Sequence, residues 1–370
     1  MSASLPAPRP AGRAALRAAP DVATAIVRAV QVAAWSARHP REPFAAKAAP
    51  RATEPIWYRS EDGWQAPLWR LAPPPGAHGT PVVLAHGLGT GHRSFDFGPA
   101  HGLATALAAE GHDVYLLTHR GDRAARPPAA PRRFDVDDIA AQDLPAAIAR
   151  VRERTGAARV GLVAHALGGW VSLLHLARAR PDTLAWLGLI GVPLRFPVVR
   201  SWPRLVAFAG RCLPTGWNIP VRAVHQALAP VQPAAWRALA PDLDGPLTRG
   251  LMADATEDLG AGVLAQVADW LGRGAVSDRG DSLDIETALR HSAVPAALFA
   301  AADDPLAPPW SMEPLAAALG APLHILPGGG HLGPLLGPAA ATVVSPALCA
   351  LSAAARLRAW GAPPIPAVAG

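Results

Sequence analysis

Two short motifs near the end of the sequence carry side chains suited to acid–base chemistry. Ala301-Ala-Asp-Asp304 follows one apolar run, and Gly328-Gly-Gly-His331 follows the next. A carboxylate that accepts a hydrogen bond from an imidazole fixes the tautomer of the ring and makes its other nitrogen a base. The two motifs therefore predict an acid–base pair in which Asp303 or Asp304 orients His331.

A third motif, upstream, has the form of a sharp strand-to-helix turn that presents a nucleophile. In Val163-Ala-His-Ala-Leu-Gly-Gly169, the small residues Ala164 and Gly168 stand two positions before and after the centre, as a G-x-S-x-G turn requires. The central position holds Ala166, and a methyl group cannot attack a carbonyl. Ser172, the nearest hydroxyl, falls well inside the following helical pattern. The motif therefore predicts a nucleophile elbow without its nucleophile.

The turn His86-Gly-Leu-Gly89 offers backbone groups rather than side chains. It follows the apolar run Pro81–Ala85. A Gly-rich turn lets a backbone N–H point into a crevice, where it can stabilise a developing oxyanion. Taken alone, the motif is equally compatible with a tight turn that has no chemical role.

An alternation of apolar runs and helical patterns places these motifs in one fold. It is typical of a parallel sheet with helices on both faces, and such sheets bind ligands at the carboxyl ends of their strands. We therefore predict an α/β fold with a mostly parallel, doubly wound sheet, preceded by a hairpin around Asp62-Gly63. The expected strands are 81–85, 113–117, 160–163, 184–190, 294–299 and 323–326, and the expected helices are 103–110, 134–155, 170–180 and 345–360.

The composition and the pattern of apolar residues change at three places along the chain. Residues 1–50 are rich in Ala, Pro and Arg, and we expect a poorly ordered extension with one short helix near Asp21–Arg38. Residues 54–195 and 293–362 carry the strand–helix alternation of the core. Between them, 196–292 holds helical segments punctuated by Trp and Pro, which predicts a helical cap. Its tryptophans either form a lid over an apolar pocket or pack the cap onto the sheet: Trp202, Trp217, Trp236 and Trp270.

Composition excludes several classes of protein. Of the 370 residues, 51% are hydrophobic and 17% are charged, so the chain is too apolar to be disordered. The net charge of +6 comes from scattered arginines, which argues against a nucleic-acid binder. No apolar run reaches the roughly 18 residues of a membrane span. We therefore expect a cytoplasmic protein without a transmembrane segment, whose N-terminal helix suits peripheral contact with a membrane.

No motif for a metal or an organic cofactor is found. The histidines do not fall into a zinc-ligand pattern, and neither a phosphate-binding loop nor a dinucleotide fingerprint is present. The sequence therefore predicts chemistry without a cofactor and without a metal.

The order of the motifs, elbow then acid then histidine, resembles that of the α/β-hydrolase superfamily, and within it the lipase and esterase branch. The resemblance extends over roughly Glu54–Trp360. His86–Gly89 is similar to the oxyanion turn of the family, and Asp143–Ile148 to a D-L-P-A-x-I segment of acid-lipase-like members. Gly330–Leu332, followed by Leu335–Gly337, resembles the region of the catalytic histidine.

The resemblance implies a role for each matched residue. Asp304, rather than Asp303, would be the acid, and His331 would be the base. The backbone N–H groups of Leu88 and Leu167 would form an oxyanion hole, and the ligand would be a small-molecule ester or acyl compound. The residues expected around the substrate are His86, Gly87, Gly89 and His165, the last of which also packs beside the elbow.

The departure from the family lies at position 166, where the family has serine and this chain has Ala166. In a serine hydrolase, loss of the nucleophile lowers turnover by about a million-fold. Three explanations follow: a degenerate hydrolase that only binds an apolar acyl or lactone-like molecule, an esterase variant that traps its substrate, or an enzyme in which the His331–Asp304 pair acts directly as a base. The sequence favours an inactive or strongly impaired esterase-type protein.

Overall fold

The computed structural model describes residues 54–97, 102–179, 181–198, 210–213, 218–228, 234–243 and 245–359. The extension expected at 1–50, with its helix near Asp21–Arg38, lies outside these residues. The same is true of Trp202 and Trp217 in the expected cap.

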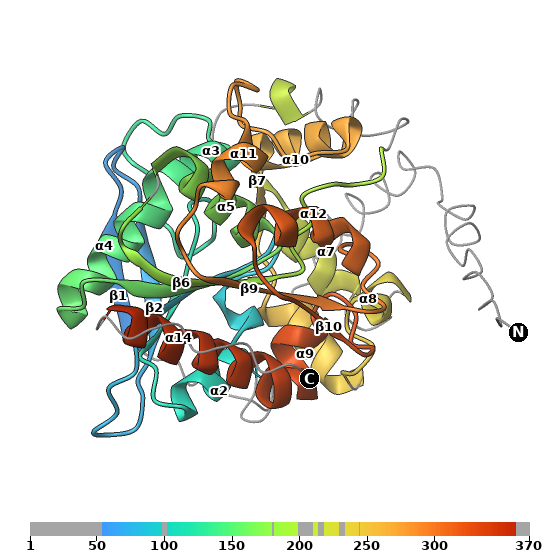
Figure 1. Ribbon diagram of the computed structural model, residues 1–370. Coiled ribbons are helices and arrows are strands. Elements are labelled where there is room, and N and C mark those ends of the chain that lie inside the picture. Colours follow the sequence, from blue (N-terminus) through green and yellow to red (C-terminus); the bar gives the residue numbers. More distant parts are fainter. Residues whose placement is uncertain are drawn as a thin grey trace, which may run out of the picture. The chain divides into compact units, whose positions relative to one another are not determined.

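Eight strands form one sheet in the order β1-β2-β4-β3-β5-β6-β9-β10 (Figure 1). All neighbours from β4 to β10 run parallel, whereas β1 and β2 form an antiparallel hairpin that extends the sheet beyond β4. The predicted mostly parallel sheet is confirmed. Its strands are β1 (Glu54–Arg59), β2 (Gln65–Leu71), β3 (Val82–Ala85), β4 (Val114–Leu117), β5 (Val160–His165), β6 (Leu184–Ile190), β9 (Ala296–Ala301) and β10 (Leu323–Leu326).

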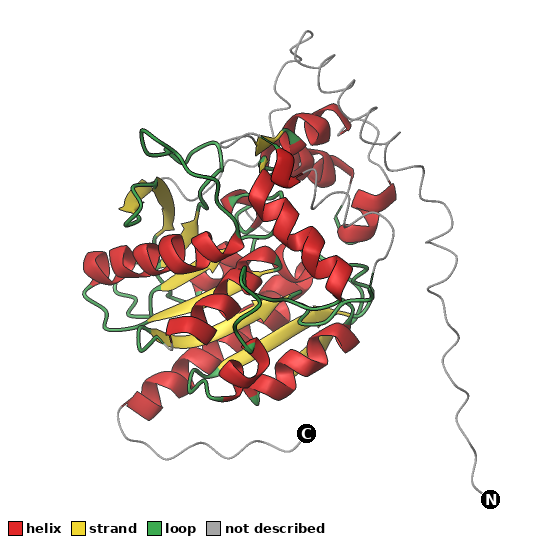
Figure 2. Cartoon of the chain, turned by 90° about the horizontal axis from the view of Figure 1, so that it is seen from above, coloured by secondary structure: helices red, strands yellow, loops and turns green. Residues whose placement is uncertain are grey.

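Helices cover both faces of this sheet, as Figures 1 and 2 show. On one face, α2 and α14 contact each other and the strands; on the other, α4, α5, α11 and α12 form a second layer. Every residue of β3, β4 and β5 is buried between the layers, which explains their continuous apolar sequences. These helices are α2 (Leu103–Ala109), α4 (Leu144–Thr155), α5 (Leu167–Ala179), α11 (Ile285–Arg290), α12 (Pro309–Leu319) and α14 (Ser345–Ala359).

The single helix expected over 134–155 is interrupted. A short α3 (Val136–Asp138) passes into a π-helical turn, Ile139–Asp143, before α4 begins. At the end of this wide turn, the buried carboxylate of Asp143 accepts a hydrogen bond of 2.7 Å from Arg120, whose side chain is also buried. Removing one partner of such a pair leaves a buried charge without compensation. Asp143 therefore ties the helix layer to the turn after β4.

The insertion between β6 and β9 is mostly helical in the residues that the structure describes. Trp270 of α10 is fully buried and meets Trp170 of α5 edge to face, with ring centroids 5.3 Å apart, so this tryptophan packs the insertion onto the helix layer. In contrast, α11 packs against α5 and α12. The cap limits 196 and 292 stay a prediction. The elements before α11 are β7 (Asn218–Ile219), α7 (Val221–Leu228), α8 (Ala234–Leu239), α9 (Gly245–Asp254), β8 (Leu259–Gly260) and α10 (Ala261–Arg273).

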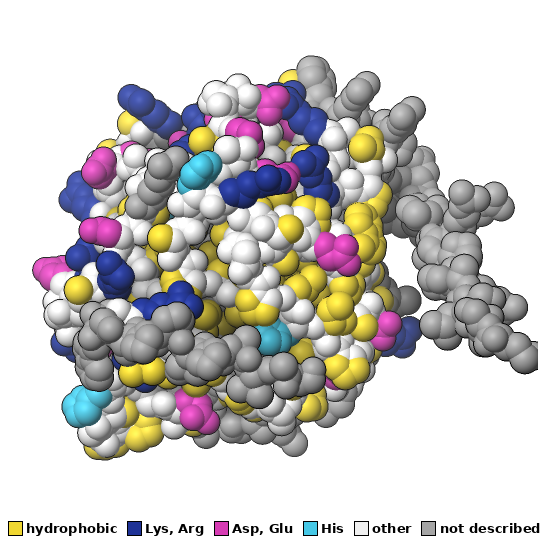
Figure 3. Space-filling model, in the orientation of Figure 1, with side chains coloured by type: hydrophobic (Ala, Val, Ile, Leu, Met, Phe, Trp, Pro, Cys, Tyr) yellow, Lys and Arg dark blue, Asp and Glu magenta, His cyan; other side chains and the backbone are white. Residues whose placement is uncertain are grey.

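The helical stretch Ala340–Arg358, which includes all of α14 but its last residue, is long and apolar enough to cross a membrane by length and composition alone. It contacts β6, β9 and α2, as a helix that covers a sheet does. On the face shown in Figure 3, arginine side chains are interspersed with Asp and Glu.

Three consecutive glycines after β10 carry the chain toward His331. Gly328, Gly329 and Gly330 have φ angles of 72°, 90° and 54°, a left-handed backbone that costs residues with a Cβ roughly 1–2 kcal/mol each. A Cβ on Gly330 would lie 2.6 Å from the carbonyl oxygen of Ala238 in α8, whereas a Cβ on Gly328 would meet nothing within 4 Å. The loop is therefore in close contact with α8 at Gly330, and this contact leaves no room for a Cβ.

We expect Gly330→Ala to lower the free energy of unfolding by about 2–5 kcal/mol, because backbone strain adds to overpacking against a carbonyl group. Gly328→Ala is the matched control: it has the same strain in open space, and we expect a loss of about 1–2 kcal/mol. Urea denaturation of both variants measures the difference. Equal losses of unfolding free energy in the two variants would show that a Cβ at position 330 does not clash with α8.

Candidate active site

Four strands of the parallel sheet, β3, β5, β9 and β10, end at the same edge and bring the candidate residues to it. The turn at His86 follows β3, Ala166 follows β5, Asp304 follows β9 and His331 follows β10. Parallel register brings the carboxyl ends of these strands together, so motifs far apart in the sequence become neighbours.

The elbow at Ala166 keeps the sharp geometry expected of the motif. Ala166 has a φ of 45°, and the chain passes at once into α5, three residues earlier than the sequence indicated. Gly168 donates its N–H to the His86 carbonyl at 3.0 Å, and a Cβ on Gly168 would lie 2.4 Å from the carbonyl oxygen of Ala85. A small residue at 168 is therefore a packing requirement.

The structure brings Asp304 and His331 together. The Nδ1–H of His331 donates to Oδ2 of Asp304 at 2.7 Å, while the other carboxylate oxygen accepts the N–H groups of Leu306 and Ala307 at 2.8 and 2.9 Å. Burial alone would raise the pKa of Asp304, but the hydrogen bonds outweigh burial and lower it. Asp304 is therefore held as an anion that fixes the His331 tautomer and leaves Nε2 for chemistry.

His165 lies between the elbow and His331. Its Nε2–H donates to the carbonyl oxygen of His331 at 3.2 Å, and the two rings are 4.5 Å apart. Burial lowers the pKa of His165 well below its ordinary value, so the ring is neutral. Its Nδ1 is buried without a partner in the described chain and faces Gly87, where a Cβ would lie 2.8 Å away. His165 thus holds the His331 backbone in place.

The oxyanion turn packs directly against the elbow. A Cβ on Gly87 would lie 3.4 Å from the Cβ of Ala166. Leu88 lines the same cavity as Ala166, and Leu167 is the first residue of α5, where N–H groups have no partner within the helix. Gly89 turns the chain with a φ of 68°. Leu167 does not line this cavity, and the oxyanion role of the Leu88 and Leu167 N–H groups stays a prediction.

His86 differs from its expected place in the substrate pocket. Its ring is buried, with Nε2 3.0 Å from Oδ2 of Asp122 and Nδ1 3.1 Å from the Gly87 carbonyl oxygen. Burial lowers the pKa of His86, but the Asp122 carboxylate outweighs burial and raises it. Both ring nitrogens are thus engaged behind the oxyanion turn, and His86 does not line the cavity. Side chains alternate in direction at a strand end, and the sequence motif does not fix this direction.

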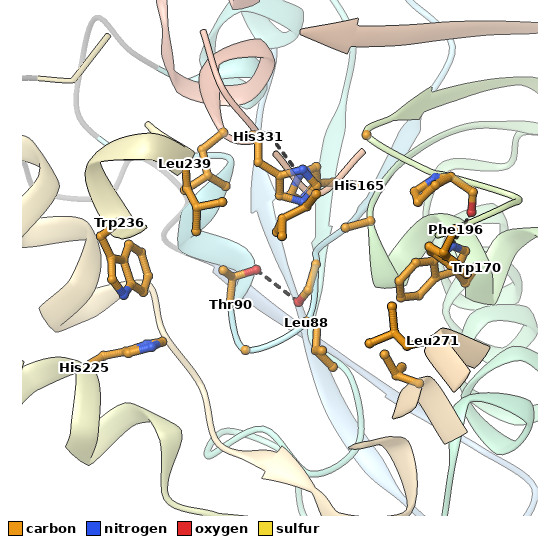
Figure 4. A pocket seen from close by; sticks show the side chains of 18 residues that line it. Leu88, Thr90, His165, Trp170, Phe196, His225, Trp236, Leu239, Leu271 and His331 are labelled. Carbon is orange, nitrogen blue, oxygen red and sulfur yellow. Dashed lines mark hydrogen bonds between the residues drawn. The ribbon is translucent and has the colours of Figure 1, made fainter. Parts of the chain in front are cut away.

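An apolar cavity of about 330 Å³ opens over the elbow. Figure 4 shows His331 and His165 between two arms: Trp170, Phe196 and Leu271 lie on one side, and His225, Trp236 and Leu239 on the other. Among the described residues, no acidic side chain lines this cavity. The space suits an apolar molecule that presents one polar group to the elbow.

The insertion is hydrogen-bonded to both turns of the site. The N–H of Gly91 donates to the Ala255 carbonyl at 2.8 Å, and the N–H of Glu257 donates to the Gly89 carbonyl at 3.1 Å. On the other side, the N–H of Leu332 donates to the Leu239 carbonyl at 2.8 Å. The insertion therefore fixes the oxyanion turn and the His331 loop as well as roofing the cavity.

Sequence reasoning missed His225 as a cavity residue. Burial lowers its pKa to about 4, and its ring meets Trp236 edge to face with centroids 4.5 Å apart. It lies on α7, whose packing direction is set by contacts with α9. No local motif marks such a position. In the described part of the chain, no group of three or more His, Cys, Asp or Glu side chains is placed to hold a metal ion.

Comparison with known proteins identifies the family and the fold. Residues 82–345 match the Alpha/beta hydrolase family. No curated protein is similar enough to be matched. Among solved structures, an esterase from Rhodococcus sp. is 19% identical with a TM-score of 0.56, covering 81% of this chain and 99% of its own. An esterase from Thermogutta terrifontis is 18% identical with a TM-score of 0.52, covering 80% and 97%.

A monoacylglycerol lipase from Paleococcus ferrophilus is similar in the same way, at 19% identity and a TM-score of 0.53, covering 77% of this chain and 99% of its own. At such identities the structural likeness establishes the fold alone. The family match spans more than half of the chain and includes the turns after β3, β5, β9 and β10. The chain belongs to the alpha/beta hydrolase family.

Proposed function

We propose that this protein binds an apolar acyl compound in the cavity and is inactive or strongly impaired in acyl-ester hydrolysis. The observation that carries the proposal is Ala166, which occupies the apex of an elbow with φ 45° beside the His331–Asp304 pair. The elbow and the acid–base pair that acyl transfer requires support this proposal, whereas the methyl group at the apex cannot attack a carbonyl.

The surroundings of Ala166 support a binding function, because the cavity beside this residue is open and has not closed up. The cavity has a volume of about 330 Å³ and is lined mainly by apolar and aromatic side chains. Such a lining stabilises a bound hydrocarbon by removing its surface from water, at roughly 25 cal/mol for each Å². Esterases and a lipase among the similar structures support an acyl ligand.

Ala166→Ser should raise hydrolysis of p-nitrophenyl esters on the order of a thousand-fold or more, because the nucleophile accounts for about a million-fold in a serine hydrolase. The measurement is turnover on a panel of acyl lengths, with mass spectrometry of the acylated or phosphonate-labelled serine. The double variant Ala166→Ser, His331→Ala is the control and should remain at the background rate. A folded Ser variant that is neither labelled nor active would show that the elbow or the pair is wrongly assigned.

A second candidate function is direct base catalysis by His331. The 2.7 Å bond to Asp304 favours it, since an imidazole held by a carboxylate can take a proton from water or from a substrate. This reaction needs no nucleophilic side chain at position 166.

Under direct base catalysis, the unaltered chain should hydrolyse activated esters or lactones measurably, and His331→Ala should lower that rate by about a hundred-fold or more. His291→Ala, which removes an exposed imidazole outside the cavity, is the matched control and should retain the rate. Identical rates in the unaltered chain and in His331→Ala would exclude the base and leave the binding function.

A further inference from the structure

His225 lines the cavity on the arm away from Trp170, and one of its ring nitrogens is buried without a partner. Its Nδ1 makes no hydrogen bond to any residue that the structure describes. Buried polar atoms in folded proteins are nearly all hydrogen-bonded, and leaving one unpaired is unfavourable. An imidazole at this place therefore requires an explanation beyond packing, for which an apolar ring would serve as well.

Other polar side chains of the cavity differ from His225, because their donors are already used within the protein. The Thr90 hydroxyl donates to a carbonyl of the oxyanion turn at 3.0 Å, and the Trp170 indole N–H donates to a backbone carbonyl at 2.9 Å. His165 donates to the His331 carbonyl. These groups hold the walls of the cavity together, whereas the His225 ring is available to a ligand.

The His225 ring is neutral and donates from a single nitrogen. Burial lowers its pKa to about 4, so near pH 7 the ring carries one proton, on Nδ1 or on Nε2. In proteins, a buried N–H without an acceptor is rarer than an acceptor without a donor, which favours the proton on Nε2. Nε2 is at the distal edge of the ring, and Figure 4 shows this ring pointing into the cavity beside Trp236. His225 therefore presents an N–H donor to the cavity.

The helix that carries His225 is fixed by side-chain hydrogen bonds. Near the start of α7, the backbone N–H of Arg222 donates to Oδ1 of Asp258 at 3.0 Å. Farther along, Nε2 of Gln226 donates to a carbonyl oxygen of α9, also at 3.0 Å. The ring itself packs edge to face on Trp236. The donor is thus positioned by the insertion, independently of the elbow and of the acid–base pair.

The two arms of the cavity consequently suit different parts of a ligand. Trp170, Phe196 and Leu271 offer contacts to a hydrocarbon, whereas the other arm adds the donor of His225. We propose that His225 forms a second polar subsite, which selects acyl compounds whose far end carries a neutral oxygen, either an ether or a hydroxyl. This inference rests on the proposed function and deepens it.

A neutral oxygen suits this subsite better than a charged group does. A charge buried among apolar side chains is unfavourable unless it is paired, and the neutral His225 ring carries no charge to pair with it. In an ester, the hydrocarbon of the acid would enter the apolar arm and the oxygen-bearing alcohol portion would lie beside His225. A few placed polar groups in an apolar pocket orient a ligand in this way.

The test compares three hexanoate esters by calorimetry on the full chain: butyl, 2-methoxyethyl and 3-hydroxypropyl hexanoate. The three have equal numbers of non-hydrogen atoms and differ only in whether, and where, the alcohol portion carries an oxygen. We expect an oxygen-bearing ester to bind about three- to ten-fold more tightly than the butyl ester, the size of one neutral hydrogen bond. The tighter of the two identifies the ether or the hydroxyl. Chromatography of the recovered ligand confirms that intact ester was measured.

His225→Phe keeps an aromatic ring beside Trp236 and removes both nitrogens. It should abolish the preference for an oxygen-bearing ester and retain binding of the butyl ester, which shows that the arm keeps its shape. Leu271→Ala is the matched control, since it lies in the apolar arm and should weaken all three esters alike. Thermal unfolding of each variant confirms that the comparison is made on folded protein.

The outcomes separate this subsite from the proposed function. Equal affinity of the unaltered chain for the three esters, or a preference for oxygen that persists in His225→Phe, would overturn the subsite and leave the acyl-binding function standing. Failure of all three esters to bind would overturn both.

Discussion

The left-handed backbone at Ala166 is the constraint on which the site depends. A residue with a Cβ adopts φ 45° only where its neighbours hold it there. Here the Ala166 N–H donates to the Ile190 carbonyl at the end of β6, and Gly168 donates to the His86 carbonyl after β3. Hydrogen bonds to the ends of β3 and β6, the two neighbours of β5, thus hold the elbow in place. Its backbone conformation is set by the sheet and does not require a serine.

Much of this arrangement could be predicted from the sequence, because its signals are local and strong. Continuous apolar runs marked the buried parallel strands, and small residues at 164 and 168 marked the elbow. The choice between Asp303 and Asp304 was different, since both follow β9. The residues alone left it open, and the motif resemblance favoured Asp304, which is the one that accepts the His331 hydrogen bond.

Other features depend on contacts between distant segments, and no local pattern encodes them. The π-helical turn before α4 aims Asp143 at Arg120, a partner 23 residues away. The two arms of the cavity are set by the way α7, α8 and α10 dock, and His225 becomes a lining residue only through that docking. An amphipathic pattern shows that a helix packs, but it does not show against which neighbour.

The absence of a nucleophilic side chain at position 166 leaves the acid–base pair undisturbed for a physical reason. Burying a charge among apolar side chains is unfavourable unless the charge is paired and hydrogen-bonded. The Asp304 carboxylate meets this condition, because it accepts hydrogen bonds from Nδ1 of His331 and from the N–H groups of Leu306 and Ala307. None of these donors belongs to the elbow. The geometry of the pair is therefore set by the loops after β9 and β10 and does not depend on a hydroxyl at position 166.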